Sequence, residues 1–259
     1  MKTLPKQQSY SPQLLAEIEH RLKRNEQTLL LLNRRGFSSV LICGECGVAI
    51  RCPSCSVSLT YHKSEGSLKC HYCGHVTRPP AKCPACSGIN LKLLGLGTQK
   101  VEEELLARFP TARLKRMDSD SVKGRDAYEK LLQGVDRREV DILLGTQMIA
   151  KGHDFPAVTL VGVVDADVGL NLPDFRSAEK TFQLITQAAG RAGRGEITGK
   201  VIIQTMNPNH YSIRHSRTHD YQGFYAEEIA YRAPLGYPPV GRIIKLEIKS
   251  ADEKQGAEA

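Results

Sequence analysis

All eight cysteines of this 259-residue chain fall into four Cys-x-x-Cys pairs between positions 43 and 86. Two thiolates separated by two residues can bind one metal ion from a tight turn, and two such pairs complete a tetrahedral four-cysteine zinc site. Because the pattern uses every cysteine, it predicts two zinc ions. The pairs are Cys43/Cys46, Cys52/Cys55, Cys70/Cys73 and Cys83/Cys86.

Four pairs can be grouped into two sites in three ways. The two inner pairs are separated by 14 residues, 56–69, which is close to the loop of an ordinary zinc ribbon. We therefore favour a nested arrangement, which also brings the two ends of the segment together, as an insertion within a larger domain requires. The first zinc ion is then bound by Cys43, Cys46, Cys83 and Cys86, and the second by Cys52, Cys55, Cys70 and Cys73. With eight thiols available, we expect His62, His71 and His75 to lie outside both sites.

Closely spaced cysteines also occur in disulfide-bonded secreted domains. This sequence shows no secretory leader, its cysteines are confined to one segment, and the remainder is typical of a cytoplasmic α/β protein. A redox-active Cys-x-x-Cys would explain one pair but not four. We therefore expect metal sites in a cytoplasmic protein.

The composition favours a soluble globular protein with a polyanionic partner. Hydrophobic residues make up 41% of the chain and charged residues 25%. The formal net charge of +8 favours nucleic acid as that partner. The longest apolar runs, Leu29–Leu32 and Val158–Val164, are far too short to span a bilayer, so no membrane association is expected.

Short apolar runs alternate with helical patterns along most of the chain. Ser11 and Pro12 are typical of a helix start, because serine is a good N-cap and proline suits the first turn. Strands joined by helical crossovers predict an α/β fold whose mostly parallel sheet is covered by helices on both faces. The expected strands are 28–33, 91–94, 112–117, 140–144, 158–164 and 200–205, and the expected helices are 12–24, 99–109, 125–133 and 178–189.

The composition changes near Asn207. A polar helical stretch leads to the Pro- and Gly-rich segment Tyr231–Gly241, which is typical of a rigid linker. Residues Arg242–Lys249 then alternate apolar and charged side chains, as a half-exposed strand does. A single strand cannot form a domain, so we expect residues 207–259 to comprise a linker and the truncated start of a C-terminal domain.

The segment 187–195, Gln-Ala-Ala-Gly-Arg-Ala-Gly-Arg-Gly, lies at the end of an expected helix. Its glycines allow close backbone approach, and its arginines offer planar donors suited to phosphate oxygens. Arg191 and Arg194 therefore resemble arginine fingers that stabilise charge on a transferred phosphoryl group. An ordinary basic helix C-cap is the plainer interpretation of a single Gly-Arg pair. The full string is far more specific than such a pair.

A second polar segment, Gly145–Pro156, follows a buried strand and should lie at the carboxyl edge of the sheet, where open α/β sheets bind ligands. Gly97-Thr98-Gln99 occupies an equivalent strand-to-helix turn. Thr98 and Thr146 could each donate to a nucleic-acid phosphate beside a helix N-terminus.

Three acidic residues after the later strands have plainer explanations than a Mg²⁺ site. Asp165 and Asp167 follow a strand, where aspartates cap helices as often as they bind metal, so we assign neither as a ligand. Asp174 is expected to be the N-cap of the following helix, with Arg176 facing a phosphate.

Together these motifs resemble those of superfamily 2 helicases. Gly145–Pro156 is similar to motif V and Gln187–Arg194 to motif VI, and a Cys₈ zinc segment inserted in such a lobe resembles the PriA-type primosomal replication-restart helicases. Segments 28–37 (TLLLLNRRGF), 97–104 (GTQKVEEE), 173–177 (PDFRS) and 231–241 (YRAPLGYPPVG) also fit this family.

The resemblance implies a RecA-like second helicase lobe with a two-zinc Cys₈ ribbon-like insertion and the same nested pairing. The implied division is 1–42 for the start of the lobe, 43–90 for the zinc subdomain, 91–206 for the rest of the lobe, and 207–259 for the linker and C-terminal start. The implied activity is that of an ATP-dependent 3′→5′ DNA helicase that recognises stalled replication forks and initiates primosome assembly.

The resemblance also implies roles for single residues and partners. Arg191 and Arg194 would face the γ-phosphate of ATP, and Gln187 would couple ATP to DNA. The residues expected to contact nucleic acid are Thr98, Thr146, Gln147 and Lys151. Expected partners are forked and single-stranded DNA, primosome proteins and single-stranded DNA-binding protein, with the chain itself monomeric.

The sequence contains no Gly-x-x-x-x-Gly-Lys-[Ser/Thr] loop and no Asp-Glu Mg²⁺ motif at the end of an expected buried strand. We therefore expect ATP and Mg²⁺ to bind only in a complete two-lobed enzyme, and the isolated chain to lack ATPase activity. The alternative is a non-catalytic zinc-dependent adaptor that binds DNA or primosome proteins. A zinc-ribbon transcription or translation factor would leave the helicase-like motifs unexplained.

Overall fold

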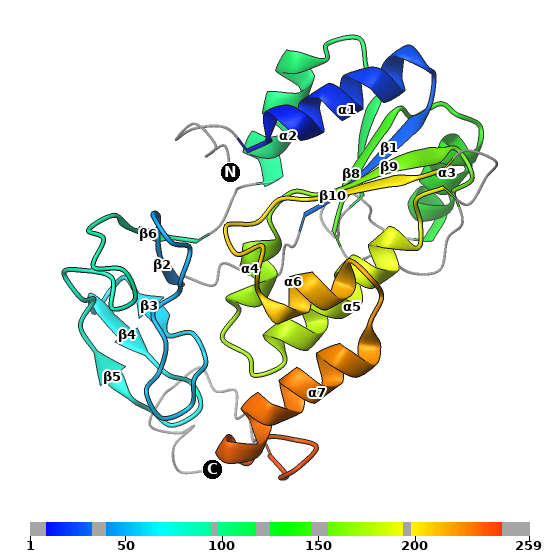
Figure 1. The fold of residues 1–259 in the computed structure, drawn as a ribbon. Coiled ribbons are helices and arrows are strands. Elements are labelled where there is room, and N and C mark those ends of the chain that lie inside the picture. Colours follow the sequence, from blue (N-terminus) through cyan, green and yellow to red (C-terminus); the bar gives the residue numbers. More distant parts are fainter. Residues whose placement is uncertain are drawn as a thin grey trace.

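The computed structural model describes residues 9–32, 40–94, 98–117, 125–146, 155–193 and 198–244. A parallel-sheet lobe with its helices lies beside a Cys-rich region, residues 40–94 (Figure 1). The elements in chain order are α1 (Pro12–Lys23), β1 (Gln27–Leu31), β2 (Leu41–Cys43), β3 (Thr60–His62), β4 (Ser67–Lys69), β5 (Val76–Thr77), β6 (Leu91–Leu93), α2 (Thr98–Arg108), β7 (Leu114–Met117), α3 (Arg125–Asp136), β8 (Ile142–Gly145), β9 (Val158–Val163), α4 (Ala166–Leu170), α5 (Ser177–Ala189), β10 (Lys200–Ile203), α6 (Tyr211–Ser216), α7 (Tyr221–Arg232) and the 3₁₀ helix η1 (Ala233–Leu235).

The lobe is built on a parallel sheet with strand order β10-β9-β1-β8-β7. Its central strand β1 is buried along its whole length. Because side chains alternate along a strand, Leu29 and Leu31 join one apolar cluster whereas Leu30 and Leu32 join the other. The expectation of a parallel sheet buried on both faces is thus confirmed.

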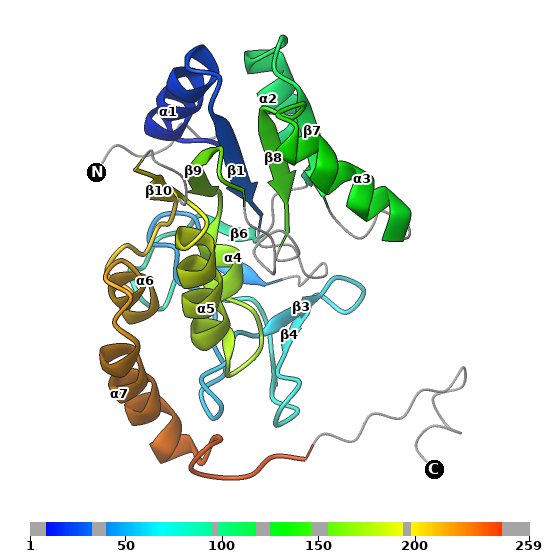
Figure 2. The same ribbon diagram turned by 90° about the vertical axis from the view of Figure 1, so that its right-hand side faces the viewer.

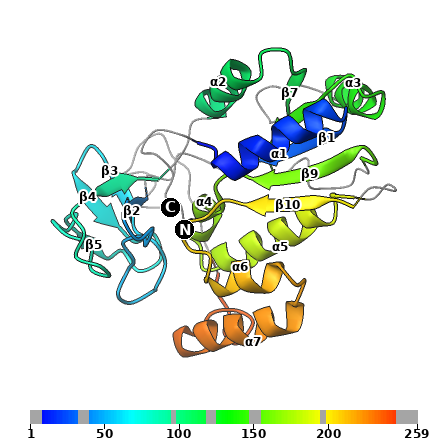
Figure 3. The same cartoon turned by 45° about the horizontal axis from the view of Figure 1, so that its top comes forward.

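Different helices cover the two faces of this sheet, as Figure 3 shows. Helices α1 and α2 supply Leu14, Ile18, Val101 and Leu105 to one cluster, and α5 supplies Leu184 and other residues to the opposite cluster. None of the helices in the described part of the chain has both the length and the apolarity needed to cross a membrane.

The start of α1 follows the sequence closely. The Ser11 side chain accepts from the Leu14 backbone N–H at 3.2 Å, and Pro12 occupies the first turn, where its missing N–H is of no consequence. The helix ends at Lys23, one residue before the expected Arg24.

The Cys-rich region closes on itself. Strands β2 and β6, near its two ends, pair antiparallel, and β3, β4 and β5 form a separate antiparallel sheet. The expected strand 91–94 is wrong as a strand of the lobe's sheet, because within the described residues β6 pairs with β2 and not with the parallel sheet. The physical reason is that Lys92 and Leu93 are exposed, so this short strand lacks the two apolar faces that a place in the parallel sheet demands.

The segment predicted to be a linker is packed against the rest of the protein. Tyr231 and Arg232 complete α7, η1 follows, and Tyr237 is buried. Residues 242–244 of the predicted strand Arg242–Lys249 are irregular, and its remainder lies outside the described residues. Figure 2 shows α6 and α7 following one another along one side of the molecule.

Candidate metal centres and the arginine turn

Each of the four Cys-x-x-Cys pairs adopts the same turn. The residue after the second cysteine has positive φ, and its N–H donates to the carbonyl of the first cysteine at 2.8–3.0 Å. The first cysteine's own N–H donates to the carbonyl five residues further on, at 2.7–2.9 Å. The left-handed residues are Gly47 (75°), Ser56 (54°), Gly74 (75°) and Ser87 (61°). This turn directs both sulfur atoms of a pair to the same side.

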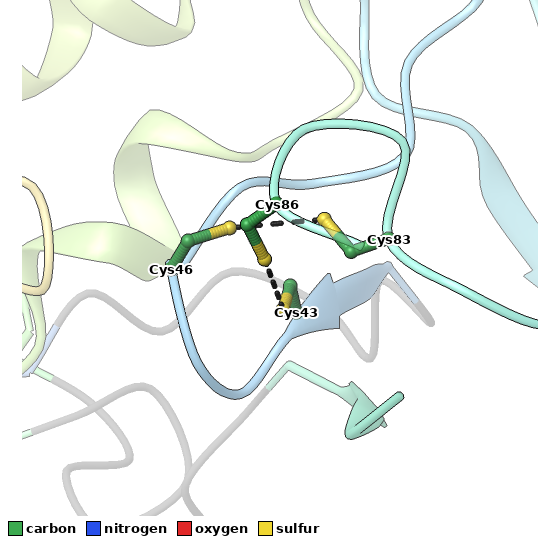
Figure 4. A group of neighbouring side chains, drawn as sticks. All are labelled: Cys43, Cys46, Cys83 and Cys86. Carbon is green, nitrogen blue, oxygen red and sulfur yellow. Dashed lines mark hydrogen bonds between the residues drawn. The ribbon is translucent and has the colours of Figure 1, made fainter. Parts of the chain in front are cut away.

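The sulfur atoms gather into two groups of four, in each of which they all lie within 4.8 Å of one another. Figure 4 shows the first group, with Cys43 and Cys46 from one turn facing Cys83 and Cys86 from the other. The second group contains Cys52, Cys55, Cys70 and Cys73. The pairs therefore group in the nested manner, and His62, His71 and His75 belong to neither group.

The sulfur separations match the geometry of a tetrahedral zinc site. Cys43 Sγ lies 3.6 Å from Cys86 Sγ, and Cys46 Sγ lies 3.7 Å from Cys83 Sγ. In the second group, the Cys52 and Cys73 sulfurs are 3.6 Å apart. A Zn–S bond of about 2.3 Å places neighbouring ligands of a tetrahedron roughly 3.8 Å apart.

The thiols within each group compete for ionisation. Burial, followed by hydrogen bonds with neighbouring thiols, raises the pKa of Cys55 to about 12. In contrast, the backbone N–H of His75 and the neighbouring Cys55 thiol lower the pKa of Cys73 to about 7. Four crowded sulfurs cannot all become thiolates without a cation among them. The donor set therefore fits zinc, which binds thiolates and would supply the compensating charge.

The turn that holds Cys43 and Cys46 contacts the lobe through Asn207, whose side chain is held by a buried carboxylate. Asp167 is 4% exposed and accepts from Thr205 Oγ1, the Met206 backbone N–H and Asn207 Nδ2 at 2.7–3.0 Å. Asn207 also reaches the Gly47 carbonyl at 3.5 Å. A Cβ on Gly47 would come within 2.7 Å of Met206 Cβ, so a glycine is needed here both for its φ and for this contact.

The second cysteine group contacts the lobe through aromatic rings. The Tyr237 hydroxyl donates to the Cys55 carbonyl at 2.9 Å, and its ring stacks on Phe175 with centroids 4.8 Å apart. Tyr72, between two of the cysteines, meets both rings edge-on at 6.1 and 6.4 Å. These three rings join the Cys-rich region, the start of α5 and the C-terminal segment, and we call them the aromatic junction.

Arg232 connects this junction to α5. Its guanidinium lies 5.0 Å from the Phe175 ring centroid and donates to Glu179 at 2.6 Å, to Glu228 at 2.7 Å and to the Pro238 carbonyl at 3.0 Å. Arg232 and Glu228 are both more than 90% buried. Buried charges are tolerated only when paired and hydrogen-bonded, so this network fixes α7 against α5.

Helix α5 carries Gln187 and leads into the arginine turn, residues 190–193. Gln187 is exposed and Arg191 is half-buried. The Gly193 backbone N–H donates to the Val158 carbonyl at 3.1 Å, and Ala192 packs against Gly199 just before β10. The turn therefore lies at the amino ends of β9 and β10. Arg194 lies outside the described residues.

The expected N-cap of α5 is wrong. Asp174 does not cap the helix, because its carboxylate accepts from the backbone N–H and the guanidinium of Arg176, and from Lys180 at 2.5 Å. Arg176 itself occupies the N-cap position without a side-chain cap bond. The Asp174 carboxylate is already hydrogen-bonded within its own turn, and these local hydrogen bonds compete with capping of the first N–H groups of α5.

The expected DNA-contacting threonines lie at the opposite edge of the sheet from the arginine turn. Thr146 directly follows β8 and donates its backbone N–H to Met117 at the end of β7, 3.3 Å away. Thr98 is the first residue of α2. Arg116, near the end of β7, donates to Glu102, near the start of α2, at 2.9 Å, so α2 runs antiparallel to β7 and Thr98 lies at the carboxyl edge of the sheet. Gln147 and Lys151 lie outside the described residues.

Asp165 behaves as a helix cap. It is the N-cap of α4 and accepts from the Val168 backbone N–H at 3.3 Å. Burial and the nearby Asp167 carboxylate raise the pKa of Asp165 to about 6. Both aspartates thus have structural partners within the chain.

Sequence reasoning missed the residues that attach the Cys-rich region to the lobe. Asn207 and Tyr237 are distant in sequence from the cysteines, and no spacing rule links them. The only local signal was the presence of the aromatic residues Tyr72, Phe175 and Tyr237 in otherwise polar turns, where large apolar side chains require a partner.

Two family models match the chain. Residues 52–78 match the PriA DNA helicase Cys-rich region (CRR) domain, and residues 96–196 match the helicase conserved C-terminal domain. The first match contains the second cysteine group, and the second contains the arginine turn and both threonines.

Curated relatives match nearly the whole chain. The replication restart protein PriA of Bacillus subtilis is 53% identical over 89% of this chain and 29% of its own length. The Synechocystis protein of the same name is 48% identical over 90% of this chain and 28% of its own length. That of Haemophilus influenzae is 40% identical over 95% of this chain and 34% of its own length. The chain therefore spans roughly a third of the length of these relatives.

Proposed function

Since this chain belongs to the PriA family of replication restart proteins, we propose that it forms the second lobe of an ATP-dependent 3′→5′ DNA helicase acting at stalled replication forks. The observation that carries the proposal is identity of 40–53% to named PriA proteins across about nine tenths of the chain. In such an enzyme, a first lobe binds ATP and Mg²⁺, and the lobe described above completes the site from across the cleft.

Arg191 and Arg194 stabilise the charge on the γ-phosphate of ATP held by the first lobe, and Gln187 couples that site to DNA. The position of the arginine turn at the end of α5 supports this role. A phosphate-facing pair needs an anchored backbone, which the bond from Gly193 to Val158 provides.

Thr98, Thr146, Gln147 and Lys151 contact the phosphates of the translocating strand. Thr98 and Thr146 stand at the carboxyl edge of the sheet, while the arginine turn stands at the amino edge. DNA and ATP thus contact opposite edges of the sheet. Closing the two lobes on ATP would move the DNA-binding edge, which is what translocation requires.

The two cysteine groups bind two zinc ions whose role is structural. Each thiolate set folds its part of the Cys-rich region, and no open ligand position is left for catalysis. The region would contribute to engaging forked and single-stranded DNA, primosome proteins and single-stranded DNA-binding protein. The protein acts as a monomer in the cytoplasm.

The test is ATP hydrolysis stimulated by forked DNA, measured for this chain alone, for a separately produced first lobe, and for their mixture. We expect activity only in the mixture. Arg194→Ala and Arg191→Ala should each lower the turnover rate by roughly 10³-fold or more, the size of an arginine-finger effect. Arg137→Ala, at an exposed position on the same lobe, removes the same charge and should leave turnover unchanged.

Two outcomes would contradict the proposal. ATP turnover by the chain alone would show that it contains its own nucleotide site. DNA binding that ignores both ATP and Arg191→Ala, in a mixture that never hydrolyses ATP, would instead support a zinc-dependent adaptor.

A further inference from the structure

A cavity of about 400 Å³ opens where three parts of the molecule meet. The Cys-rich region contributes Arg51 and residues 55–58, the lobe contributes Phe175 and its neighbours, and helices α6 and α7 contribute His210, Tyr211, Arg214 and Tyr231. Its volume falls in the range of small-molecule sites, roughly 300–1,000 Å³. Neither the arginine turn nor Thr98 and Thr146 line it, so the roles assigned in the proposed function do not involve it.

One wall of this cavity is a stack of aromatic rings. His210 stacks on Tyr211 with centroids 4.5 Å apart, and Tyr211 stacks on Tyr231 at 5.2 Å. The Tyr211 hydroxyl donates to Glu228 at 2.6 Å, which fixes the middle ring. Tyr231 is 63% exposed, so one of its faces is available to a further planar group.

The His210 ring supplies a hydrogen-bond donor at this wall. Its Nδ1 accepts from the Ser212 backbone N–H at 3.3 Å, so in the neutral ring the proton resides on Nε2. Burial, reinforced by Arg51 and Arg214, lowers the pKa of His210 to about 4, and the ring is therefore neutral near pH 7. A neutral imidazole stacks without adding charge.

Among the described residues, Arg51 is the one arginine of the cavity lining without a carboxylate partner. Of the carboxylates that line it, Glu228 is paired with Arg232, Glu227 with Arg214, and Asp174 with Lys180. Within the described part of the chain, Arg51 is in no ion pair, and its one hydrogen bond goes to the Ser56 carbonyl at 3.3 Å. A guanidinium placed in this way is suited to a phosphate.

We propose that this cavity is a nucleotide subsite, in which a base stacks on Tyr231 and the attached phosphate binds Arg51. The inference deepens the proposed function, because a nucleic-acid-binding protein presents nucleotides to its surface. Aromatic faces with an adjacent cation are the usual means of binding single-stranded nucleic acid without sequence preference. The nucleotide comes either from a DNA strand or from a free mononucleotide, and the two sources are separable by experiment.

The experiment uses the zinc-loaded chain and two probes, a short single-stranded oligonucleotide containing 2-aminopurine and the free 2-aminopurine deoxynucleotide. Stacking on tyrosine quenches the fluorescence of 2-aminopurine. Tyr231→Ala should weaken binding roughly 5- to 150-fold and abolish the quench, since stacking on one aromatic side chain accounts for about 1–3 kcal/mol. Tyr231→Phe should restore both, because the ring and not the hydroxyl is required.

Arg51→Ala should weaken binding and lower the slope of log affinity against log salt by about one, as the loss of one phosphate contact does. Tyr225→Ala and Arg217→Ala are the matched controls, because both residues are exposed and lie outside the cavity. Neither control should change the quench.

Binding that is weakened by both Tyr231→Ala and Arg51→Ala supports the subsite. Binding of both probes shows that a free mononucleotide suffices, and binding of the oligonucleotide alone shows that a DNA strand is required. Binding that ignores both substitutions, or absence of binding by either probe, overturns it. The readout requires no ATP and no first lobe. If the quench is intact but the mixture of the two lobes hydrolyses no ATP, the proposed function is contradicted and the subsite is not. If the mixture hydrolyses ATP but the quench is absent, the subsite is contradicted and the proposed function is not.

Discussion

In the parallel-sheet lobe, strands β1, β8 and β9 are buried along their whole length, whereas β3, β5 and β6 of the Cys-rich region are half-buried or exposed. The larger apolar cluster of the Cys-rich region even includes Cys52 and Cys70, which are predicted metal ligands. The lobe is thus stabilised by burial of apolar side chains, and the Cys-rich region by its cysteine groups. Small units with little apolar core commonly depend on metals or disulfides in this way.

Removal of zinc is the strongest test of this difference. Chelation, or Cys52→Ser, should unfold the Cys-rich region because binding of structural zinc contributes on the order of 10 kcal/mol to folding. Hydrogen exchange should then show lost protection in residues 40–94 and retained protection in β1, β8 and β9. Ser54→Ala, at an exposed position inside the same turn, is the control and should change nothing. Loss of protection in the sheet as well would show that the lobe depends on the metal.

The reciprocal test removes apolar volume from the lobe. Leu160 is fully buried in β9, so Leu160→Ala should lower the free energy of unfolding of the lobe by about 2–5 kcal/mol. Zinc content, measured after dialysis, should remain two ions per chain. Leu106→Ala, on the exposed side of α2, should have a much smaller effect. Zinc loss in Leu160→Ala would contradict independent stabilisation of the two regions.

Acid should destabilise the lobe through Glu26. Burial opposes its ionisation, but hydrogen bonds from Thr159, Arg24 and Arg21 outweigh it and lower the pKa of Glu26 to about 2. The ionised Glu26 therefore stabilises the folded lobe by roughly 3 kcal/mol at pH values above 4.5, the ordinary pKa of a glutamate. This stabilisation is lost as pH falls from 4.5 toward 2. Urea unfolding of the lobe between pH 6 and 2 should show a shallower pH dependence in Glu26→Gln.

Asp165 has the opposite effect on the pH dependence of the lobe's stability. Because its pKa is raised to about 6, its ionisation above pH 6 costs stability that is recovered as pH falls toward 3.8. Asp165→Asn retains a capping oxygen and should therefore stabilise the lobe at pH 8 but not at pH 4. Equal effects at both pH values would show that the carboxylate is not destabilised in the folded protein.

A smaller effect is expected where the two regions meet. Tyr237→Phe keeps the stacked ring but removes the donor to the Cys55 carbonyl, which should cost about 1 kcal/mol. Hydrogen exchange should quicken at residues 52–58 and 232–240 without any loss of zinc. The comparison variant is Tyr225→Phe, whose exposed side chain lies outside the junction. Unchanged exchange in Tyr237→Phe would mean that the junction does not fasten the Cys-rich region.

The smallest effect concerns the turns themselves. Ser56 adopts a left-handed φ of 54°, a conformation that costs a residue with a side chain about 1–2 kcal/mol but costs glycine little. Ser56→Gly should therefore raise the thermal stability of the Cys-rich region slightly, by at most about 1 kcal/mol, since glycine also gains entropy when unfolded. The same change at Ser54, outside the left-handed position, should not be stabilising.

Much of this molecule was predictable from local patterns. The helix at α1 followed from Ser11 and Pro12, and the buried strands followed from continuous apolar runs, because capping and burial depend on neighbouring residues. The cysteine spacing likewise predicted two four-cysteine groups, since a two-residue gap brings two sulfurs to one side of a turn. These are properties that a few consecutive residues determine.

Contacts between distant segments were decided only by the tertiary structure. Nothing in the sequence linked Asn207 to Gly47, or Tyr237 to Cys55, because such contacts depend on how whole elements pack. For the same reason the sequence did not show that the segment expected to be a linker lines a cavity together with Arg51. The sequence by itself determined the local turns, the buried strands and the metal-binding chemistry. The tertiary structure alone decided which surfaces those elements share, since packing is set by the shape and charge of complete faces.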